Sequence, residues 1–261
     1  MLKISIITPS FNQGKYIEDT IRSISGQGYE NFEHIVVDGG STDNTIEVLK
    51  KNDHLKWVSE KDRGQTHAIN KGLDMATGDI LNYLNSDDML SPGSLMKVND
   101  YFRENSGTDL VYGNCTMVDD KGKEIKLRRS EDFDLQRFLY LGYSYIQQPT
   151  VFFRRGVFEE IGYFDEGLDF VMDYDYWIRT AIKNKELKYL DTELALMRIH
   201  GEAKTVSANK DMFKEAFKTS KKYGGSKIPR YYFHYIFWFI LTTFPGLFKL
   251  IFNLRNKGRI K

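Results

Sequence analysis

Two adjacent acids follow an apolar stretch in the segment LNYLNSDDML, which spans residues 81–90. The first four residues have the character of a buried strand, and apolar residues resume directly after the acids. Between them stand Asn85, Ser86, Asp87 and Asp88. An ionised carboxylate beside an apolar strand is costly unless water, an opposite charge or a cation satisfies it. The chemistry open to this segment is therefore solvation, ion pairing or the binding of a metal ion.

Three other polar stretches follow strand-like segments, at residues 8–10, at Asp38 and at residues 60–62. In open α/β sheets, the ligand crevice lies beyond the carboxyl ends of the strands. Together with residues 85–88, these stretches place polar side chains after four strands. We therefore expect the four strand ends to line one crevice.

The first two of these strand ends offer contacts for a nucleotide. Pro9 and Phe11 have the shape to bracket a flat ring, and Asp38 is an acceptor for ribose hydroxyls or a base N–H. The alternative is two ordinary strand-to-helix connections, in which Asp43 caps the second helix. No G-x-G-x-x-G or G-x-x-x-x-G-K-[ST] motif occurs, so a dinucleotide fold or a P-loop is disfavoured.

Alternating strands and helices are predicted to position these residues over the first ninety positions. The expected elements are strands at 4–7, 34–37, 57–59 and 79–84, with helices at 17–24, after 41–44 and at 68–76, the last stopped by Gly78. This alternation indicates a parallel sheet that is covered on both faces.

The pattern is different beyond residue 90. A helix is expected to begin at Ser91–Pro92, because serine is a good cap and proline is tolerated in the first turn. The further expected elements are a hairpin turn at 119–122, strands at 150–153 and 194–199, a helix around 174–182 and a helix ended by Gly224–Gly225.

The chain has 261 residues and a net charge of only +1, but its charges are unevenly distributed. Residues 221–261 hold nine Lys and Arg and no acid, while residues 1–220 hold 28 basic and 36 acidic residues. This asymmetry indicates a polyanion or an anionic membrane as a partner. The basic residues flank an apolar, aromatic block and form no continuous stripe, so nucleic-acid binding is not expected.

That apolar block, residues 231–248, has no charged side chain and is rich in aromatic residues. It is short for a membrane span and is interrupted by Pro245–Gly246. Basic residues on both sides favour a helical tail at a membrane surface. The alternative is a helix packed on the core or on a second subunit. One cysteine and no signal-peptide pattern indicate a cytoplasmic protein, peripheral on the inner face of the membrane.

An ordered set of stretches resembles the family-2 glycosyltransferases over about residues 1–205. The stretches are IITPSFNQGKYIEDTIRSI, VVDGGSTDNT, SEKDRGQTHAINKGLDMATGDILNYLNSDD, QQPTVFFRR, GYFDEGLDFVMDYDYWIR and MRIHGEAKT. The resemblance implies the α/β fold called GT-A, with a mostly parallel central sheet flanked by helices. It places a glycosyltransferase domain at 1–225, with a nucleotide-binding half at 1–90 and an acceptor-binding half at 91–225. The tail at 226–261 lies outside it.

The resemblance also assigns residues to the donor. The implied nucleotide contacts are Thr8, Pro9, Phe11, Asp38, Asp62, Gly64, Asn85 and Ser86. The family's D-x-D motif falls on residues 85–87, where Asn85 replaces the first acid. Asp87 and His200 are the implied metal ligands, for Mn²⁺ or Mg²⁺. An imidazole ligand favours Mn²⁺, because the harder Mg²⁺ prefers oxygen.

For the acceptor, the resemblance implies a general base at Asp173, with Asp175 as the second choice. Asp173 is also a candidate to cap the helix that follows it. Gln148 and Arg179 match positions where the family lines the acceptor side. Lys204 follows His200 in an expected loop, where it would add positive charge beside the diphosphate.

The function implied is transfer of a sugar, with inversion, from a nucleoside-diphosphate sugar, by default a UDP-sugar. The acceptor would be a glycan, expected to be lipid-linked because the tail points to a membrane, in bacterial polysaccharide synthesis. The alternative is an inactive sugar-nucleotide-binding protein on the same fold.

Overall fold

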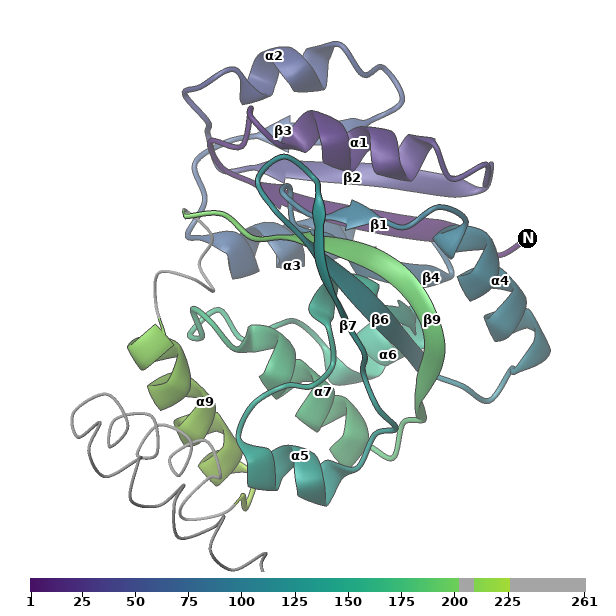
Figure 1. The fold of residues 1–261 in the computed structure, drawn as a ribbon, viewed down its shortest axis with the longest axis vertical. Coiled ribbons are helices and arrows are strands. Elements are labelled where there is room, and N and C mark those ends of the chain that lie inside the picture. The colour runs from purple at the N-terminus through teal and green to yellow at the C-terminus, as the bar shows by residue number, and fades with distance from the viewer. Residues whose placement is uncertain (202–208, 226–261) are drawn as a thin grey trace, which may run out of the picture.

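The computed structural model describes residues 1–201 and 209–225, which form a nine-stranded sheet with helices on both faces (Figure 1). The strands are β1 Ile4–Ser10, β2 Phe32–Asp38, β3 Lys56–Ser59, β4 Ile80–Tyr83, β5 Met89–Leu90, β6 Leu110–Val118, β7 Glu124–Arg128, β8 Phe152–Arg154 and β9 Leu187–Arg198. The helices are α1 Ile17–Ser25, α2 Thr45–Lys50, α3 Gln65–Met75, α4 Ser94–Glu104, α5 Leu135–Leu141, α6 Arg155–Ile161, α7 Met172–Ile182 and α9 Asn209–Lys222, with a 3₁₀ turn η1 at Gln148–Thr150.

The sheet has the order β3-β2-β1-β4-β8-β6-β9-β5, and β7 pairs with β6. Its first four strands are parallel to one another. Their carboxyl ends therefore lie at one edge, and Ser10 is in register with Asp38 and Asp38 with Ser59. This confirms the expected convergence of the β1, β2 and β3 ends.

Beyond β4 the sheet is mixed, because β8 runs antiparallel to both β4 and β6. The long strand β9, green in Figure 1, runs parallel to β6 and antiparallel to the short β5. In that pairing, Met89 is in register with Leu196. The end of β9 is thereby brought back to the loop that follows β4.

Alternating strand residues supply the two layers of the core. Ile7, Ile35 and Val37 face the layer that contains α3, α5 and α7, which includes Trp177. Ile6 and Val36 point to the other face, where α1, α2 and α4 cover them. Residues one position apart on β1 and β2 thus belong to opposite layers, as the period of a strand requires.

Most expected elements are present, but α4 begins later than predicted. Its cap is Gly93, with a left-handed φ of 74°, and its first helical residue is Ser94. Ser91 accepts from the backbone and side chain of Ser94, so residues 91–93 form a turn. Gly78 likewise does not end α3, which stops at Met75.

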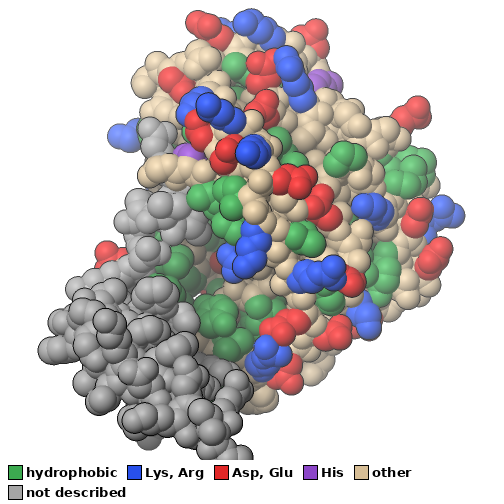
Figure 2. All heavy atoms as spheres, in the orientation of Figure 1, with side chains coloured by type: hydrophobic (Ala, Val, Ile, Leu, Met, Phe, Trp, Pro, Cys, Tyr) green, Lys and Arg blue, Asp and Glu red, His purple; other side chains and the backbone are tan. Residues whose placement is uncertain are grey.

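Acidic and basic side chains are interspersed on the face drawn in Figure 2, which therefore carries no large field of one sign. In the described part of the chain, no helix is long and apolar enough to cross a bilayer. The predicted tail at 226–261 and the predicted contact Lys204 lie outside the described residues.

Candidate active site

The two residues predicted to hold a metal meet at the end of β4. Asp87 follows β4, and His200 lies just beyond β9, 113 positions later in the chain. The Nε2 atom of His200 lies 2.9 Å from an Oδ atom of Asp87. The pairing of β5 with β9 produces this contact, because it fixes both loops to one edge of the sheet.

The His200 imidazole is held on its other side by an aromatic ring. Its centroid lies 4.6 Å from that of Tyr16, at the start of α1. The Nδ1 atom of His200 has no hydrogen-bond partner among the described residues, although it is buried. The ring is therefore fixed by packing, with one nitrogen directed at Asp87.

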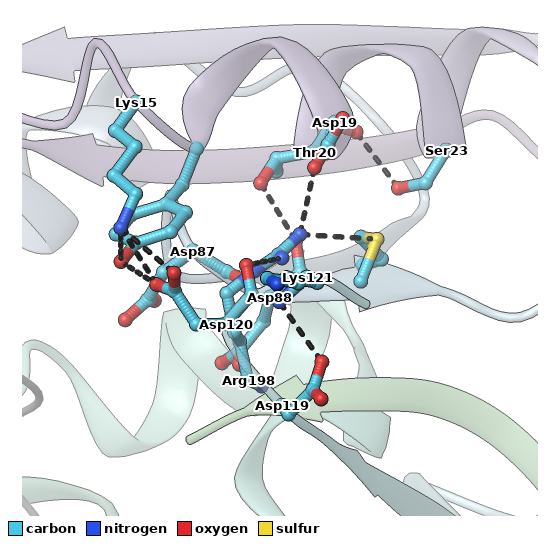
Figure 3. A network of polar contacts seen from close by, with 12 residues as sticks. Lys15, Asp19, Thr20, Ser23, Asp87, Asp88, Asp119, Asp120, Lys121 and Arg198 are labelled. Atoms are coloured by element: carbon cyan, nitrogen blue, oxygen red, sulfur yellow. Dashed lines mark hydrogen bonds and ion pairs between the residues drawn. The ribbon is translucent and has the colours of Figure 1, made fainter. Parts of the chain in front are cut away.

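Arg198 holds the segments around Asp87 together by hydrogen bonds. It was not predicted from the sequence. Its guanidinium donates to the carbonyl of Asp87 at 3.1 Å, to the carbonyl of Asp120 at 2.9 Å and to a carboxylate oxygen of Asp19 at 2.8 Å (Figure 3). Its backbone N–H donates to Asp88 at 3.0 Å. This buried side chain thus connects α1, the β4–β5 loop and the tip of the β6–β7 hairpin.

The second acid of the opening motif is structural. Asp88 is buried, and its carboxylate accepts from Arg198 and, at 3.3 Å, from Asn85. Its carbonyl accepts from Thr20 of α1 at 2.7 Å. Burial, together with the nearby charge of Asp87, raises the pKa of Asp88 well above its usual range. Asp88 therefore anchors the loop, while Asp87 keeps 19% of its side chain exposed.

The hairpin between β6 and β7 is fastened to the loop after β1. Lys15 forms an ion pair with Asp120 at 2.7 Å, and the hydroxyl of Tyr16 donates to the same carboxylate (Figure 3). The hairpin tip and the first strand end thereby lie on the same side as His200. Neither contact was expected from the sequence.

Asn85 stands within a small amide cluster. Its carbonyl oxygen accepts from Gln65 at 2.7 Å, and its amide nitrogen lies 3.4 Å from the side-chain oxygen of Gln148. Gln148 donates to the carbonyl of Tyr83 at 2.7 Å. The structure thus places the predicted acceptor-side residue Gln148 next to the predicted donor-side residue Asn85, while Ser86 is buried beside them.

The predicted nucleotide contacts of β1 and β2 are internal. Thr8 lies 2.9 Å from His34, and both are fully buried. Asp38 is also fully buried, and its carboxylate accepts from Ser59, from the backbone N–H groups of residues 40 and 41 and from the Ser41 hydroxyl. These hydrogen bonds make Asp38 a structural residue that fixes the loop after β2, and its carboxylate has no surface exposed to a ligand. Pro9 is buried as well.

Phe11 is the exposed member of this group, with 59% of its surface accessible. Asp62 and Gly64 lie in the loop between β3 and α3. Asp62 accepts from the N–H of Gly64 at 2.9 Å, and Gly64 has a φ of 119° that side-chain-bearing residues rarely adopt. The accessible nucleotide candidates are therefore an aromatic ring and a carboxylate.

The predicted base, Asp173, is the second residue of α7, whose cap position is Val171. The capping alternative is therefore wrong. Asp173 accepts from the N–H of Tyr174 at 2.8 Å. Burial raises the pKa of Asp173 to about 6. Burial, together with the charges of Asp173 and Asp88, raises the pKa of the Tyr83 hydroxyl well above its usual range.

The start of α7 is capped by Glu215, which comes from α9. Its carboxylate accepts from three successive N–H groups, those of residues 169, 170 and 171, at 2.7–3.1 Å. A charged acceptor at a helix N-terminus is stabilising. This long-range cap fixes the turn from which Asp173 projects.

Asp175 and Arg179 have structural roles, contrary to the sequence-based expectation. Asp175 is fully buried and pairs with Arg179 at 2.7 Å, while Tyr223 donates to its other oxygen at 2.8 Å. Arg179 also donates to the carbonyls of Ile161 and Tyr163. Asp175 is therefore removed as a candidate base, and Arg179 as an acceptor contact.

The side chains present can serve as ligands for a cation whose other coordination positions are filled by the substrate. Within residues 1–201 and 209–225, no three His, Cys, Asp or Glu side chains form a ready-made cage. Asp87 and His200 supply one carboxylate oxygen and one imidazole nitrogen at a single point. Mg²⁺ and similar ions at phosphate-transfer sites are commonly held by one or two carboxylates together with substrate phosphates.

A family model described as "Glycosyl transferase family 2" matches residues 5–162. The chain belongs to this family. A related protein of Mycobacterium tuberculosis, named "PGL/p-HBAD biosynthesis glycosyltransferase", is 33% identical over 181 residues, which cover 67% of this chain and 68% of the relative. This protein is therefore a glycosyltransferase.

Solved structures show the same fold for this glycosyltransferase. TarS 1-349 of S. aureus, in complex with UDP-GlcNAc, has a TM-score of 0.67 at 20% identity, covering 88% of this chain and 69% of that one. The mannosyltransferase PcManGT of Pyrobaculum calidifontis, in complex with GDP-Man and Mn²⁺, has a TM-score of 0.61 at 16% identity, covering 94% and 81%. Longer TarS chains extend further, since this chain spans 37% of one of them. The predicted GT-A fold is confirmed.

Replacing Arg198 with methionine should destabilise the glycosyltransferase and raise its KM for the donor. Two carbonyls and one carboxylate lose a charged donor, so we expect a loss of about 2–3 kcal/mol in the free energy of unfolding. Denaturant titration measures the loss, and initial rates give the KM. The control is Arg22→Met, which removes only an exposed ion pair of α1 and should cost about 0.5 kcal/mol. Equal effects of the two variants would contradict the bracing role.

Proposed function

We propose that this glycosyltransferase transfers a sugar from a UDP-sugar to a hydroxyl of a glycan acceptor, with inversion at the anomeric carbon. The observation that supports this proposal best is the meeting of Asp87 and His200 at 2.9 Å, at the same sheet edge as Phe11 and Asp62. In this arrangement, residues 1–90 bind the nucleotide and residues 91–225 receive the acceptor.

On the donor side, Phe11 stacks on the base and Asp62 accepts a hydrogen bond from it. Thr8, Pro9 and Asp38 support this pocket from behind, because all three are buried. Around the ribose and sugar, Gly64 allows close approach of the backbone, and Asn85 and Ser86 supply polar groups. Solved structures with a similar fold are complexes with UDP, UDP-GlcNAc or GDP-Man, and UDP is the default nucleotide here.

Asp87 and His200 would hold Mn²⁺ or Mg²⁺ beside the diphosphate. The bound ion would stabilise the negative charge that develops on the departing diphosphate. Arg198 keeps Asp87 in position through the Asp87 carbonyl, and Tyr16 keeps the His200 ring in position by packing. The two ligands are thereby organised before the substrate arrives.

On the acceptor side, Asp173 is the general base. The Oδ1 atom of Asp173 accepts from Tyr174, which leaves the other oxygen for the acceptor hydroxyl. Asp173 takes the hydroxyl proton while the acceptor oxygen forms a bond to the anomeric carbon. The bond from that carbon to the diphosphate oxygen breaks on the opposite face, and UDP leaves with the electron pair. Gln148 lies close enough to the sugar-facing Asn85 to bind either substrate.

The pH dependence of kcat should show the ionisation of Asp173. Burial raises the pKa of this carboxyl to about 6, and only its ionised form accepts a proton. We expect kcat to rise about tenfold per pH unit below pH 6 and to level off above it. A series of kcat measurements over pH, with a saturating donor, gives the pH below which kcat falls. A fall that begins only near pH 4, the ordinary range for aspartate, would contradict the assignment.

The acceptor is proposed to be a lipid-linked glycan, and the setting bacterial polysaccharide synthesis at the cytoplasmic face of the membrane. The basic, aromatic composition of residues 226–261 supports this proposal. The alternative, a binding protein without activity, is disfavoured because Asp87, Asp173 and His200 are all retained.

A panel of sugar nucleotides tests the proposal. The full-length protein is incubated with Mn²⁺ and UDP-, GDP-, CDP- or dTDP-linked sugars, and release of the nucleoside diphosphate is followed with and without a lipid-linked acceptor. We expect release from a UDP-sugar, stimulated by the acceptor and abolished by EDTA. Binding without release from any donor would instead support the inactive protein.

A further inference from the structure

The segments on either side of Asp173 are both bound by residues from the last part of the described chain. Before it, the backbone N–H groups of residues 169, 170 and 171 donate to the carboxylate of Glu215 in α9, at 2.7–3.1 Å. After it, the carboxylate of Asp175 accepts from the hydroxyl of Tyr223, the residue that follows α9, at 2.8 Å. Helix α9 packs beside α5 and α7 (Figure 1). Asp173 therefore lies between two contacts made by α9 and the residue after it.

Glu215 supplies a cap that α7 does not have of its own. The cap residue of α7, Val171, makes no capping hydrogen bond through its side chain, and the first turn contains two acids, Asp173 and Asp175. The first N–H groups of a helix lack partners within it, and an acid in the first turn can accept from them, as in a capping box. The carboxylate of Asp175 is buried and already paired. Without Glu215, Asp173 is therefore the acid of α7 that would take over the cap.

Tyr223 fixes the direction in which Asp173 projects. The side chain of Asp175 is only 1% exposed, and Arg179 binds the carboxylate oxygen that Tyr223 does not bind. Residues two positions apart on a helix point about 200° apart around its axis. Because Asp175 is held against the end of α9, Asp173 is turned away from α9. The contact with Tyr223 thus limits rotation of the first turn of α7.

We infer that Glu215 and Tyr223 are positioning residues for sugar transfer. Glu215 caps α7 in place of Asp173, which leaves the Asp173 carboxylate free for the acceptor hydroxyl, and Tyr223 sets the direction of Asp173 through Asp175. Both residues lie beyond the region that the family model matches, which ends at residue 162. This inference rests on the proposed role of Asp173 as the general base.

Glu215→Ala should lower kcat by about 10–100-fold, because a carboxylate that turns to cap its own helix is displaced from the acceptor hydroxyl. The KM for the UDP-sugar should stay within about threefold of wild type, since the change removes no donor contact. Glu215→Gln keeps one acceptor oxygen and should recover part of kcat. Tyr223→Phe loses only a hydroxyl and should lower kcat by about threefold, again with an unchanged KM. Initial rates of UDP release, with the lipid-linked acceptor present, measure these effects.

The same substitution in the Asp173→Asn protein separates positioning from damage to the fold. If Glu215 acts through Asp173, Glu215→Ala should reduce the residual rate of Asp173→Asn by less than about twofold. A loss caused by partial unfolding would instead have the same factor in both proteins. Equal factors, or an unchanged kcat in Glu215→Ala alone, would overturn the inference. Wild-type turnover in Asp173→Asn would refute the proposed base itself.

Two matched controls accompany these variants. Asp211→Asn removes an exposed acid from the same helix, and Tyr163→Phe removes a tyrosine hydroxyl that binds Asp74 of α3. Both should leave kcat unchanged. If Glu215→Ala is too unstable to assay, Tyr223→Phe supplies the answer: a lower kcat with an unchanged KM supports the inference, and an unchanged kcat overturns it.

Discussion

Asparagine at position 173 should lower kcat by about 10³-fold, with the KM for the donor nearly unchanged. The amide preserves the size of the carboxylate and can still accept from the N–H of Tyr174, so the start of α7 stays intact. It cannot take the proton of the acceptor hydroxyl. Steady-state rates of UDP release, with acceptor present, measure the effect.

Two observations separate this loss from damage to the fold. A carboxyl whose pKa is raised in the folded protein is destabilising when ionised, and the destabilisation grows as the pH rises from about 4 to 6. Asp173→Asn should therefore raise the free energy of unfolding at pH 7, by an amount on the order of 1 kcal/mol for this partly exposed side chain. The control is Asp169→Asn, an exposed acid nearby, which should keep full activity. Comparable turnover in Asp173→Asn would refute its assignment as the base.

Asparagine at position 87 should remove the metal dependence of donor turnover and lower kcat/KM by about 10²–10³-fold. Asp87 is the only acid of the β4–β5 loop with an accessible carboxylate, because Asp88 is buried and bound by Arg198 and Asn85. The imidazole of His200 alone is a weak site for a hard cation. Rates measured over a range of Mn²⁺ concentrations give the effect directly.

The matched control for this change is Asp100→Asn, an exposed acid on α4 that should leave the Mn²⁺ dependence unaltered. Fold integrity is checked by thermal unfolding, which should differ little between the two variants, since Asp87 contributes its carbonyl, and not its carboxylate, to the Arg198 contacts. Retention of the wild-type Mn²⁺ response in Asp87→Asn would show that the metal is held elsewhere.

Local patterns predicted the fold of residues 1–90 well. Strands β1 to β4 were located from short apolar runs, and the convergence of their polar ends followed from the parallel sheet. The pairing of β5 with β9 could not be predicted, because two residues at Met89–Leu90 carry no periodic signal. The start of α4 was misplaced because Ser91–Pro92 has the composition of a helix start, while the left-handed turn at Gly93 sets the actual one.

Candidate site residues that stand in short motifs were named from the sequence, whereas residues that act through long-range contacts were missed. Asp87 and His200 were predicted, from two separate motifs, to be ligands of one metal ion, and the structure brings them together. Arg198 and Glu215 gave no local signal, since their partners lie far away in the chain. Arg179 was wrongly predicted to contact the acceptor. Its i, i+4 spacing from Asp175 instead indicates an ion pair within α7.

In the proposed reaction, Asp87 serves the donor and Asp173 serves the acceptor. Calorimetric titration of UDP, in the presence of Mn²⁺, into Asp87→Asn and Asp173→Asn tests it most directly. We expect Asp173→Asn to bind UDP within about threefold of wild type, and Asp87→Asn to bind at least about tenfold more weakly. Equal losses in both variants, or a larger loss in Asp173→Asn, would contradict this division of roles.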